Sequence, residues 1–283
     1  MIEAPKQRLK AVQRRILEGV LACVPAHPAA HGFVRGRNCT TLVRPHTGQR
    51  CVLRMDAKDF FASFRRARVL RVFLNLGYPE PVAVAFADLC TASTPRRVLE
   101  RGLGPSPGDA AAESLRAKLR LRHLPQGAPT SPALANLCAF SLDARLTGLA
   151  KKFGANYTRY ADDLLFSGGE AFARDAHRCE VYAAAVLLEC GLDTAHRKTK
   201  VLRAGTSQGA AGLVMNVHPA IPRRDREQLE AILVNCARRG VAGQNRAGHP
   251  DFRAHLRGRI AHVASVHAAL GERLATLFEQ IVW

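Results

Sequence analysis

The order of apolar and polar residues predicts a chain of helices with short strands between them. Apolar residues recur at helical spacing near the N-terminus, which predicts an amphipathic helix over residues 7–22. The same spacing, interrupted by Gly and Pro, predicts further helices over residues 66–76, 80–92, 132–152 and 171–190, and two or three basic helices within 222–283. Ser131 is the expected N-cap of the helix that follows it.

Strands are predicted where apolar and polar residues alternate or where a short apolar run is bounded by turn residues. Residues 51–56 and 119–124 fit this description, and VLRAG (201–205) and GLVMNV (212–217) predict two more short strands. The stretch 91–113 is rich in Pro, Gly, Ala and Ser, so we expect a surface insertion there. NYTRYADDLLFSG predicts two strands joined by a tight turn at Ala161–Asp163.

The predicted order of strand, helices, strand, helix, hairpin, helix and strand indicates an α+β protein. It resembles a split βαβ unit followed by an all-helical C-terminal part. Many folds share so coarse an order, so the pattern indicates a fold class and leaves the function open.

The charge balance favours a polyanionic partner. There are 42 Lys and Arg against 23 Asp and Glu, a formal net charge of +19. Such a surplus favours nucleic acid first and an anionic membrane second. No apolar stretch approaches the roughly 20 residues that span a bilayer, so we expect no membrane partner. The eight cysteines include no C-x-x-C pair, which argues against a zinc site and a disulfide scaffold and favours a reducing cytoplasm.

Three aspartates are the candidate catalytic residues. Asp56 ends a predicted strand, and Asp162 and Asp163 lie in the turn of the predicted hairpin. Each of them taken alone is an ordinary turn or cap residue. Together, in an apolar hairpin of a basic chain, they form a costly arrangement that bound cations would offset. Phosphoryl transfer by two Mg²⁺ ions needs such converging carboxylates.

Three blocks resemble successive signatures of reverse transcriptases, in the order that family has. They are VLRMDAKDFFASF (52–64), LPQGAPTSPALANL (124–137) and YTRYADDLLFSG (157–168). Three flanking blocks also resemble the family: AHGFVRGRN (30–38), GLDTAHRKTKVL (191–202) and GLVMNVHP (212–219). The likeness covers roughly residues 2–220 and is strongest to bacterial enzymes, especially retron-type ones and their group II intron relatives.

The resemblance implies a right-hand polymerase with fingers, a split βαβ palm and a helical thumb. Residues 1–50 would be partial fingers, 51–220 the palm with inserted fingers elements, and 221–283 the thumb. In the family, a segment like Ile2–Pro5 closes a fingers hairpin, so the first hairpin strand is expected to be missing and Ile2–Ala4 to be an exposed edge.

The resemblance also implies roles for residues around the aspartates. Asp56, Asp162 and Asp163 would hold two Mg²⁺ ions, or Mn²⁺ as a substitute, with Asp163 the least direct ligand. The backbone around Asp59 and Phe60 would hold the nucleotide's triphosphate. The remaining implied residues of the nucleotide pocket are Phe61, which would exclude a 2′-OH, Gln126 and Gly127, which would line the pocket, and Lys198, which would stabilise charge on the triphosphate or protonate pyrophosphate.

Each of these roles has a plainer alternative. Phe61 could be a core aromatic, Lys198 a solvated lysine, and Lys200 competes with Lys198 for the same role. The implied nucleic-acid contacts are basic or aromatic residues of the fingers, hairpin and thumb: Arg35, Arg37, Tyr160, Arg223, Arg224 and Arg257. Their alternative is a set of solvated surface side chains.

Two blocks depart from retron-type enzymes. An N-A-x-x-H block is represented by Leu42–His46, which keeps only the His, and a V-T-G block by Ala210–Gly212, which keeps only the Gly. In the family these blocks are associated with recognition of the cognate structured RNA. The chain would therefore read a divergent RNA or belong to a neighbouring class such as the phage-defence types.

The function expected from the sequence is RNA-directed DNA polymerisation in a retron-like or phage-defence system. The expected partners are a structured RNA template, an RNA/DNA duplex, dNTPs and an effector or toxin encoded nearby. Two alternatives stay open: a polymerase-derived RNA-binding scaffold whose catalysis is secondary or lost, and a template-independent nucleotidyl transferase.

Overall fold

The structure, a computed structural model, describes residues 2–103 and 109–283. Its centre is a five-stranded antiparallel sheet of order β2-β3-β1-β4, in which β5 also pairs with β1. The strands are β1 (Cys51–Lys58), β2 (Asn156–Tyr160), β3 (Asp163–Gly168), β4 (Asp193–Thr194) and β5 (Lys200–Arg203). A small separate hairpin consists of β6 (Gly209–Ala210) and β7 (Leu213–Val214).

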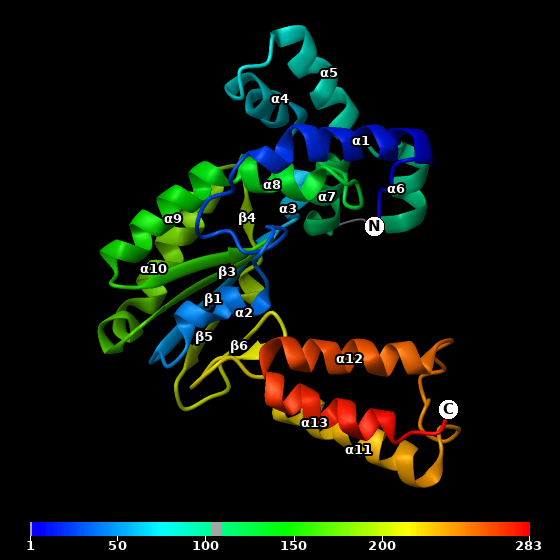
Figure 1. The fold of residues 1–283 in the computed structure, drawn as a ribbon. Helices are drawn as coiled ribbons and strands as arrows, with labels where there is room; N and C mark the ends of the chain where they lie inside the picture. The colour runs from blue at the N-terminus through cyan, green and yellow to red at the C-terminus, as the bar shows by residue number, and fades with distance from the viewer. Residues whose placement is uncertain (1, 104–108) are drawn as a thin grey trace.

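One face of the sheet packs against two long helices. These are α9 (Phe140–Lys152) and α10 (Glu170–Glu189), which lie side by side along it (Figure 1). Alternate strand residues such as Met55 and Phe166 point into this main core and are fully buried there. Burial of each such side chain contributes about 1.5–3 kcal/mol, which fixes which face of each strand turns inward.

The opposite face is covered more thinly. Here Val52 and Leu165 pack against Leu42 and Val43 of the short helix α2 (Cys39–Val43). The 3₁₀ helix η2 (Arg44–His46) follows α2 directly and lies against β3. Asp56 and Asp163 belong to this face, at one end of the sheet.

The remaining helices of the first 140 residues gather beyond one end of the sheet (Figure 1). They are α1 (Gln7–Gly19), η1 (Leu21–Cys23), α3 (Phe60–Ser63), α4 (Arg66–Asn75), α5 (Glu80–Cys90), α6 (Arg96–Leu103), α7 (Ala110–Arg120) and α8 (Ser131–Cys138). Most of them share the main core with the sheet through residues such as Phe60, Phe73 and Leu134, whereas α6 and α7 bury Leu99 and Leu119 in a small separate cluster.

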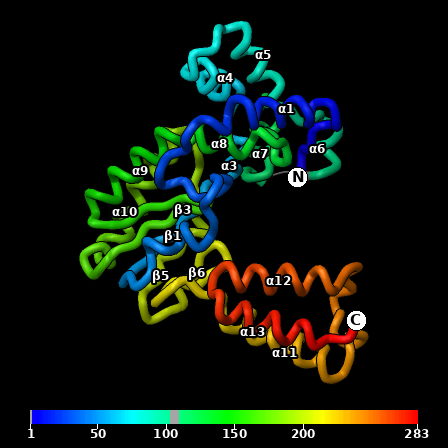
Figure 2. The backbone as a smooth tube through the Cα atoms, in the orientation of Figure 1, coloured from blue at the N-terminus to red at the C-terminus, as the bar shows by residue number. Residues whose placement is uncertain are grey.

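The C-terminal part is a three-helix unit with a core of its own. It comprises α11 (Arg223–Arg239), α12 (Phe252–Val266) and α13 (Ala268–Glu279), and it extends away from the sheet (Figures 1 and 2). Its buried residues are Leu229, Leu233, Cys236, Leu256, Ile260, Val263, Leu274, Phe278 and Ile281. Within the described ranges, none of the helices is both long and apolar enough to cross a membrane.

The predicted fold class and most predicted elements are confirmed. The α+β arrangement, the first helix and the hairpin are present, and of the three C-terminal helices α11 and α12 are basic. The division of the chain at residues 50 and 220 stays a prediction. Residues 2–4 have no full antiparallel partner within the described chain; Glu3 donates its backbone N–H to the Gln126 carbonyl at 2.8 Å, and Ile2 is exposed.

The strand predicted at residues 119–124 is wrong. Helix α7 continues to Arg120, and beyond it only His123 makes isolated bridges, to Arg65 and Ala92. Residues 110–120 are rich in Ala, Leu, Lys and Arg, whose high helix propensity outweighs a short alternation at their end.

Two other expectations are corrected. The insertion predicted over residues 91–113 is largely helical, because Leu99 of α6 is buried with Leu119 and Ala62; residues 104–108 lie outside the described residues. The helix predicted over residues 132–152 is two helices, interrupted at Ala139. Ser131 is not its N-cap: it lies inside the first turn, beside a proline that suits that position.

Candidate active site

The three candidate aspartates meet at one end of the central sheet. Strands β1 and β3 are antiparallel, and Asp56 lies directly opposite Asp163 in their register. Residues opposite each other in this way project from the same face. The backbone N–H of Ala57 donates to the carbonyl of Asp162 at 2.8 Å, so the hairpin turn is bonded to the strand that carries Asp56.

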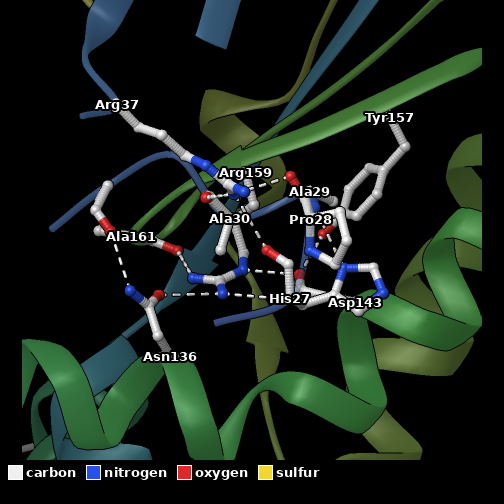
Figure 3. A network of polar contacts seen from close by, with 11 residues as sticks. His27, Pro28, Ala29, Ala30, Arg37, Asn136, Asp143, Tyr157, Arg159 and Ala161 are labelled. Carbon is white, nitrogen blue, oxygen red and sulfur yellow. Dashed lines mark hydrogen bonds and ion pairs between the residues drawn. The ribbon is translucent and has the colours of Figure 1, made fainter. Parts of the chain in front are cut away.

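The turn that presents Asp162 is held by a buried arginine. Strand β2 ends at Tyr160 and β3 begins at Asp163, so Ala161 and Asp162 form the turn, with Ala161 left-handed at φ 51°. Arg159 is fully buried and donates from Nη1 to the Ala161 carbonyl at 3.0 Å. Asp143 of α9 neutralises this guanidinium, with contacts of 2.6 and 2.7 Å (Figure 3).

The same buried network extends to α8 and to the N-terminal loop. Arg159 Nη2 donates to Asn136 Oδ1 at 3.1 Å, and Asn136 Nδ2 donates to the Gly32 carbonyl at 2.9 Å. Tyr157 donates its hydroxyl to Asp143 at 2.9 Å, and burial together with that negative charge raises the pKa of Tyr157 well above its usual value. Two helices and a loop therefore fix the position of the turn.

Negative charge accumulates at Asp162. Burial, and then repulsion from Asp56 and Asp163, raise the pKa of the Asp162 carboxyl, although its own backbone N–H opposes the shift. A carboxylate pair that repels itself in a partly buried site favours a bound cation.

Lys198 supplies positive charge beside Asp56. Its Nζ lies 3.0 and 3.2 Å from the two Asp56 oxygens, and this hydrogen bond raises the pKa of Lys198. The 3₁₀ helix η3 (His196–Lys198) is placed there because the backbone N–H of Ala195 donates to the Asp56 carbonyl at 2.8 Å. The competing Lys200 lies on β5 opposite Arg54, which is two residues before Asp56 on β1.

Asp163 is already paired. Arg54 Nη2 and Nε lie 2.8 and 3.1 Å from Asp163 Oδ1. No group of three or more His, Cys, Asp or Glu side chains in the described residues is arranged to hold a metal ion. Mg²⁺ needs only one or two protein carboxylates when substrate phosphates complete its octahedron. Asp56 and Asp162 stay the predicted ligands of a divalent cation, and Asp163, which is paired with Arg54, stays the least direct one.

The residues after Asp56 form an aromatic corner. Asp59 is left-handed at φ 53°, and its carboxylate pairs with Lys118 at 3.2 Å. Phe60 is buried edge-to-face against Phe64 at 4.9 Å, so only its backbone is available to a ligand. Phe61 is half-buried, and its ring lies 6.1 Å from that of Phe33.

The Gln126–Gly127 segment lies against the N-terminus. Both residues are exposed, and the Gln126 carbonyl accepts from Glu3. Gly127 has φ 127°, and a Cβ there would lie 3.0 Å from the Ile2 side chain. A larger residue at 127 would therefore meet both backbone strain and a clash.

The predicted nucleic-acid contacts fall into two groups. Arg37 donates from Nη1 to the carbonyls of His27, Pro28 and Ala30 at 3.2, 2.8 and 2.5 Å, which braces its own loop (Figure 3). The others are exposed or half-exposed: Arg35 in the same loop, Tyr160 at the hairpin, and Arg223, Arg224 and Arg257 on α11 and α12.

Sequence reasoning missed Arg54, Phe33 and the buried pair Arg159–Asp143. Strand alternation carried a signal for Arg54, since it lies two residues before Asp56 and so shares its face. His46, the surviving residue of the N-A-x-x-H block, is fully buried and bonds Ser167 Oγ at 2.7 Å and Thr158 Oγ1 at 2.8 Å. Its side chain therefore secures η2 to the sheet in the protein interior.

Comparisons with known proteins identify the family of this chain. The family model described as reverse transcriptase (RNA-dependent DNA polymerase) matches residues 1–230. The chain is 40% identical over 282 residues to the retron Mx65 reverse transcriptase of Myxococcus xanthus, covering 97% of this chain and 60% of the relative. It is 38% identical over 293 residues to the retron Mx162 reverse transcriptase of the same organism, covering 98% and 57%.

The chain thus spans about three fifths of the length of these relatives. Among solved structures, a telomerase from Candida albicans in complex with a fragment of telomeric RNA is similar over 95% of this chain and 48% of its own, at 12% identity and a TM-score of 0.40. The match to the family model covers most of the chain, and with the aspartates placed as described, this chain belongs to the reverse transcriptase family.

Proposed function

We propose that this chain is the RNA-directed DNA polymerase of a retron-like system, adding dNTPs to a primer on a structured RNA template. The observation that carries the proposal is the meeting of Asp56, Asp162 and Asp163 at one sheet end, with Lys198 on Asp56. The names of the Myxococcus relatives support the retron assignment. An effector protein as partner, and a place in phage defence, remain part of this proposal.

The chain's own residues divide the work of phosphoryl transfer. Asp56 and Asp162 would hold divalent metal ions, which reverse transcriptases generally use and which neutralise charge on the phosphates and activate the primer hydroxyl. Lys198, whose raised pKa keeps it protonated at neutral pH, would stabilise the triphosphate or give a proton to the leaving pyrophosphate. Arg54 holds Asp163, and Arg159 holds the turn.

Primer extension on poly(rA)·oligo(dT) with Mg²⁺ tests the proposal. We expect dTTP incorporation that depends on the template and falls on the order of a thousandfold in Asp162→Asn, because the amide keeps the shape and loses the charge. Asp175→Asn is the matched control: Asp175 lies on α10, paired with Arg178 at 2.9 Å, away from the sheet end.

Each alternative function predicts a different result. An RNA-binding scaffold would bind the duplex and incorporate nothing, in wild type and Asp162→Asn alike. A template-independent transferase would incorporate dTTP on oligo(dT) alone. Asp163→Asn gives a finer test, because its pairing with Arg54 predicts a smaller loss than Asp162→Asn; equal losses would make Asp163 a full ligand.

A further inference from the structure

Phe33 has an unfavourable backbone conformation and an exposed ring. Its φ is 61°, and 51% of its surface is exposed. Aromatic residues rarely adopt the left-handed region, and such residues persist only where the surroundings enforce them. Within the described residues, the other non-glycine residues with positive φ are Asp59, Ala161 and Ala211, and the first two border the candidate active site.

The loop that carries Phe33 is fastened to the catalytic turn. The backbone N–H of His31 donates to the Arg159 carbonyl at 2.7 Å, and Asn136 holds the Gly32 carbonyl at 2.9 Å. Gly32 itself lies so close that a Cβ there would come within 2.8 Å of the Ala161 backbone nitrogen. Asn136 also accepts from Arg159, and Arg159 donates to the Ala161 carbonyl, so one hydrogen-bonded unit joins the loop to the turn (Figure 3).

In this unit the Phe33 ring lies beside two residues of the predicted site, Phe61 and Tyr160. Its centroid lies 6.1 Å from that of Phe61 and 6.0 Å from that of Tyr160, with interplanar angles of 55° and 47°. Both distances fall within the range in which aromatic pairs attract each other. The Phe61 ring also lies 5.7 Å from that of Phe60 and packs against the main core.

We propose that Phe33 is a positioning residue for sugar selection, whose ring holds the neighbouring Phe61 ring in place so that it cannot yield to a 2′-OH. The inference rests on the proposed polymerase function. The Phe61 ring can exclude a single 2′-OH only if the ring itself is held in place. A half-exposed ring with few neighbours can rotate away from the hydroxyl. Phe33, held in a rare backbone conformation by the docked loop, supplies the second support.

The test measures how strongly the enzyme prefers dATP over ATP, and not its overall activity. On a primed RNA whose first templating base is U, the kcat/KM for dATP is divided by that for ATP, since these differ only at the 2′ position. We expect Phe33→Ala to lower this ratio about three- to tenfold, in line with the loss of an aromatic pair. Phe33→Tyr keeps the ring and should keep the ratio.

A double-mutant cycle tests whether Phe33 acts through Phe61. If Phe33 acts through Phe61, then Phe33→Ala has no further effect on the ratio in a Phe61→Ala background. Tyr182→Ala is the matched control, because it removes a half-exposed aromatic ring from α10 that contacts Phe153 and should leave the ratio unchanged. Thermal unfolding of each variant checks that the fold persists.

Three outcomes in an active enzyme would overturn the inference. The dATP/ATP ratio could be unchanged in Phe33→Ala, or the losses of this ratio in Phe33→Ala and Phe61→Ala could multiply in the double variant. Alternatively, Phe33→Ala could raise the KM for template and keep the ratio, which would make Phe33 a template contact. Absence of any dATP incorporation by wild type, on a substrate that it binds, would instead reject the polymerase function itself and the inference with it.

Discussion

At the scale of single residues, the ion pair between Lys198 and Asp56 distinguishes two lysines that are close in sequence. Lys198 reaches both Asp56 oxygens, whereas Lys200 lies opposite Arg54 on the neighbouring strand. We expect Lys198→Ala to lower kcat for single-nucleotide incorporation about a hundredfold or more, the range of a general acid or a charge-stabilising group.

Lys200→Ala is the control for that measurement, because it removes the same charge from an adjacent position. It should change kcat by less than about threefold, the size of an exposed charge effect. The reverse ranking of the two variants would assign the role to Lys200. Because Lys198 has a raised pKa, activity that depends on its proton should persist into alkaline pH and fall only as the pH passes that value.

His46 makes a prediction about stability. Burial, and then the nearby His31, lower its pKa to about 3, against an ordinary value of 6.5. Between these values the unfolded chain binds a proton at His46 and the folded chain does not, so acidification favours unfolding. The free energy of unfolding therefore falls by up to about 1.4 kcal/mol per pH unit because of His46 as the pH drops below 6.5. Above pH 6.5, His46 adds no pH dependence.

The measurement is urea unfolding between pH 7.5 and 5, where few carboxylates titrate. His46→Gln should unfold at lower urea throughout and should show a flatter dependence on pH. Some slope should persist, because burial also lowers the pKa of His31, to about 4. A variant with the slope of wild type would mean that the His46 proton is not linked to folding.

At the scale of elements, the pair Arg159–Asp143 joins β2 to α9 with both side chains at 0% exposure. Removal of one partner leaves a buried charge, so we expect Asp143→Asn to lower the free energy of unfolding by about 3–5 kcal/mol. Replacing both partners, as in Arg159→Met with Asp143→Leu, should cost less stability than Asp143→Asn alone.

The same pair also connects stability to activity. The double replacement removes the hydrogen bond to the Ala161 carbonyl, so it should lose incorporation activity even where it regains stability. Denaturant unfolding and primer extension on the same preparations separate the two effects. Full activity in the double variant would show that the turn keeps its geometry without Arg159.

The elements also show how far sequence reasoning reached. The hairpin and its aspartates were predictable because apolar strands on both sides of Ala161–Asp162 are a local signal. The partner of Arg159 was not, because Asp143 lies on a separate helix and only the fold brings the two together. Phe33 was missed for the same reason: its conformation is enforced by contacts with Asn136 and Ala161 that no local pattern records.

At the scale of the whole molecule, the charge of +19 predicts binding to nucleic acid that weakens with salt. The helices α11–α13 pack around their own core and carry many exposed arginines, so they form a surface suited to a phosphate backbone. Neither Arg224 nor Arg257 makes an ion pair with another described residue, whereas Arg223 pairs with Glu227 at 2.6 Å.

This difference in ion pairing predicts how strongly each of the three arginines contributes to binding. Arg224→Ala and Arg257→Ala should each weaken binding to an RNA/DNA hybrid and reduce the slope of log K against log[KCl] by about one, the signature of one lost phosphate contact. Arg223→Ala should have the smaller effect, because Glu227 already offsets part of its charge and is left unpaired in the variant. Fluorescence anisotropy over a KCl series measures both quantities. Equal slopes in all three variants and wild type would place the hybrid elsewhere on the molecule, since a contact with phosphate cannot be lost without releasing fewer counterions.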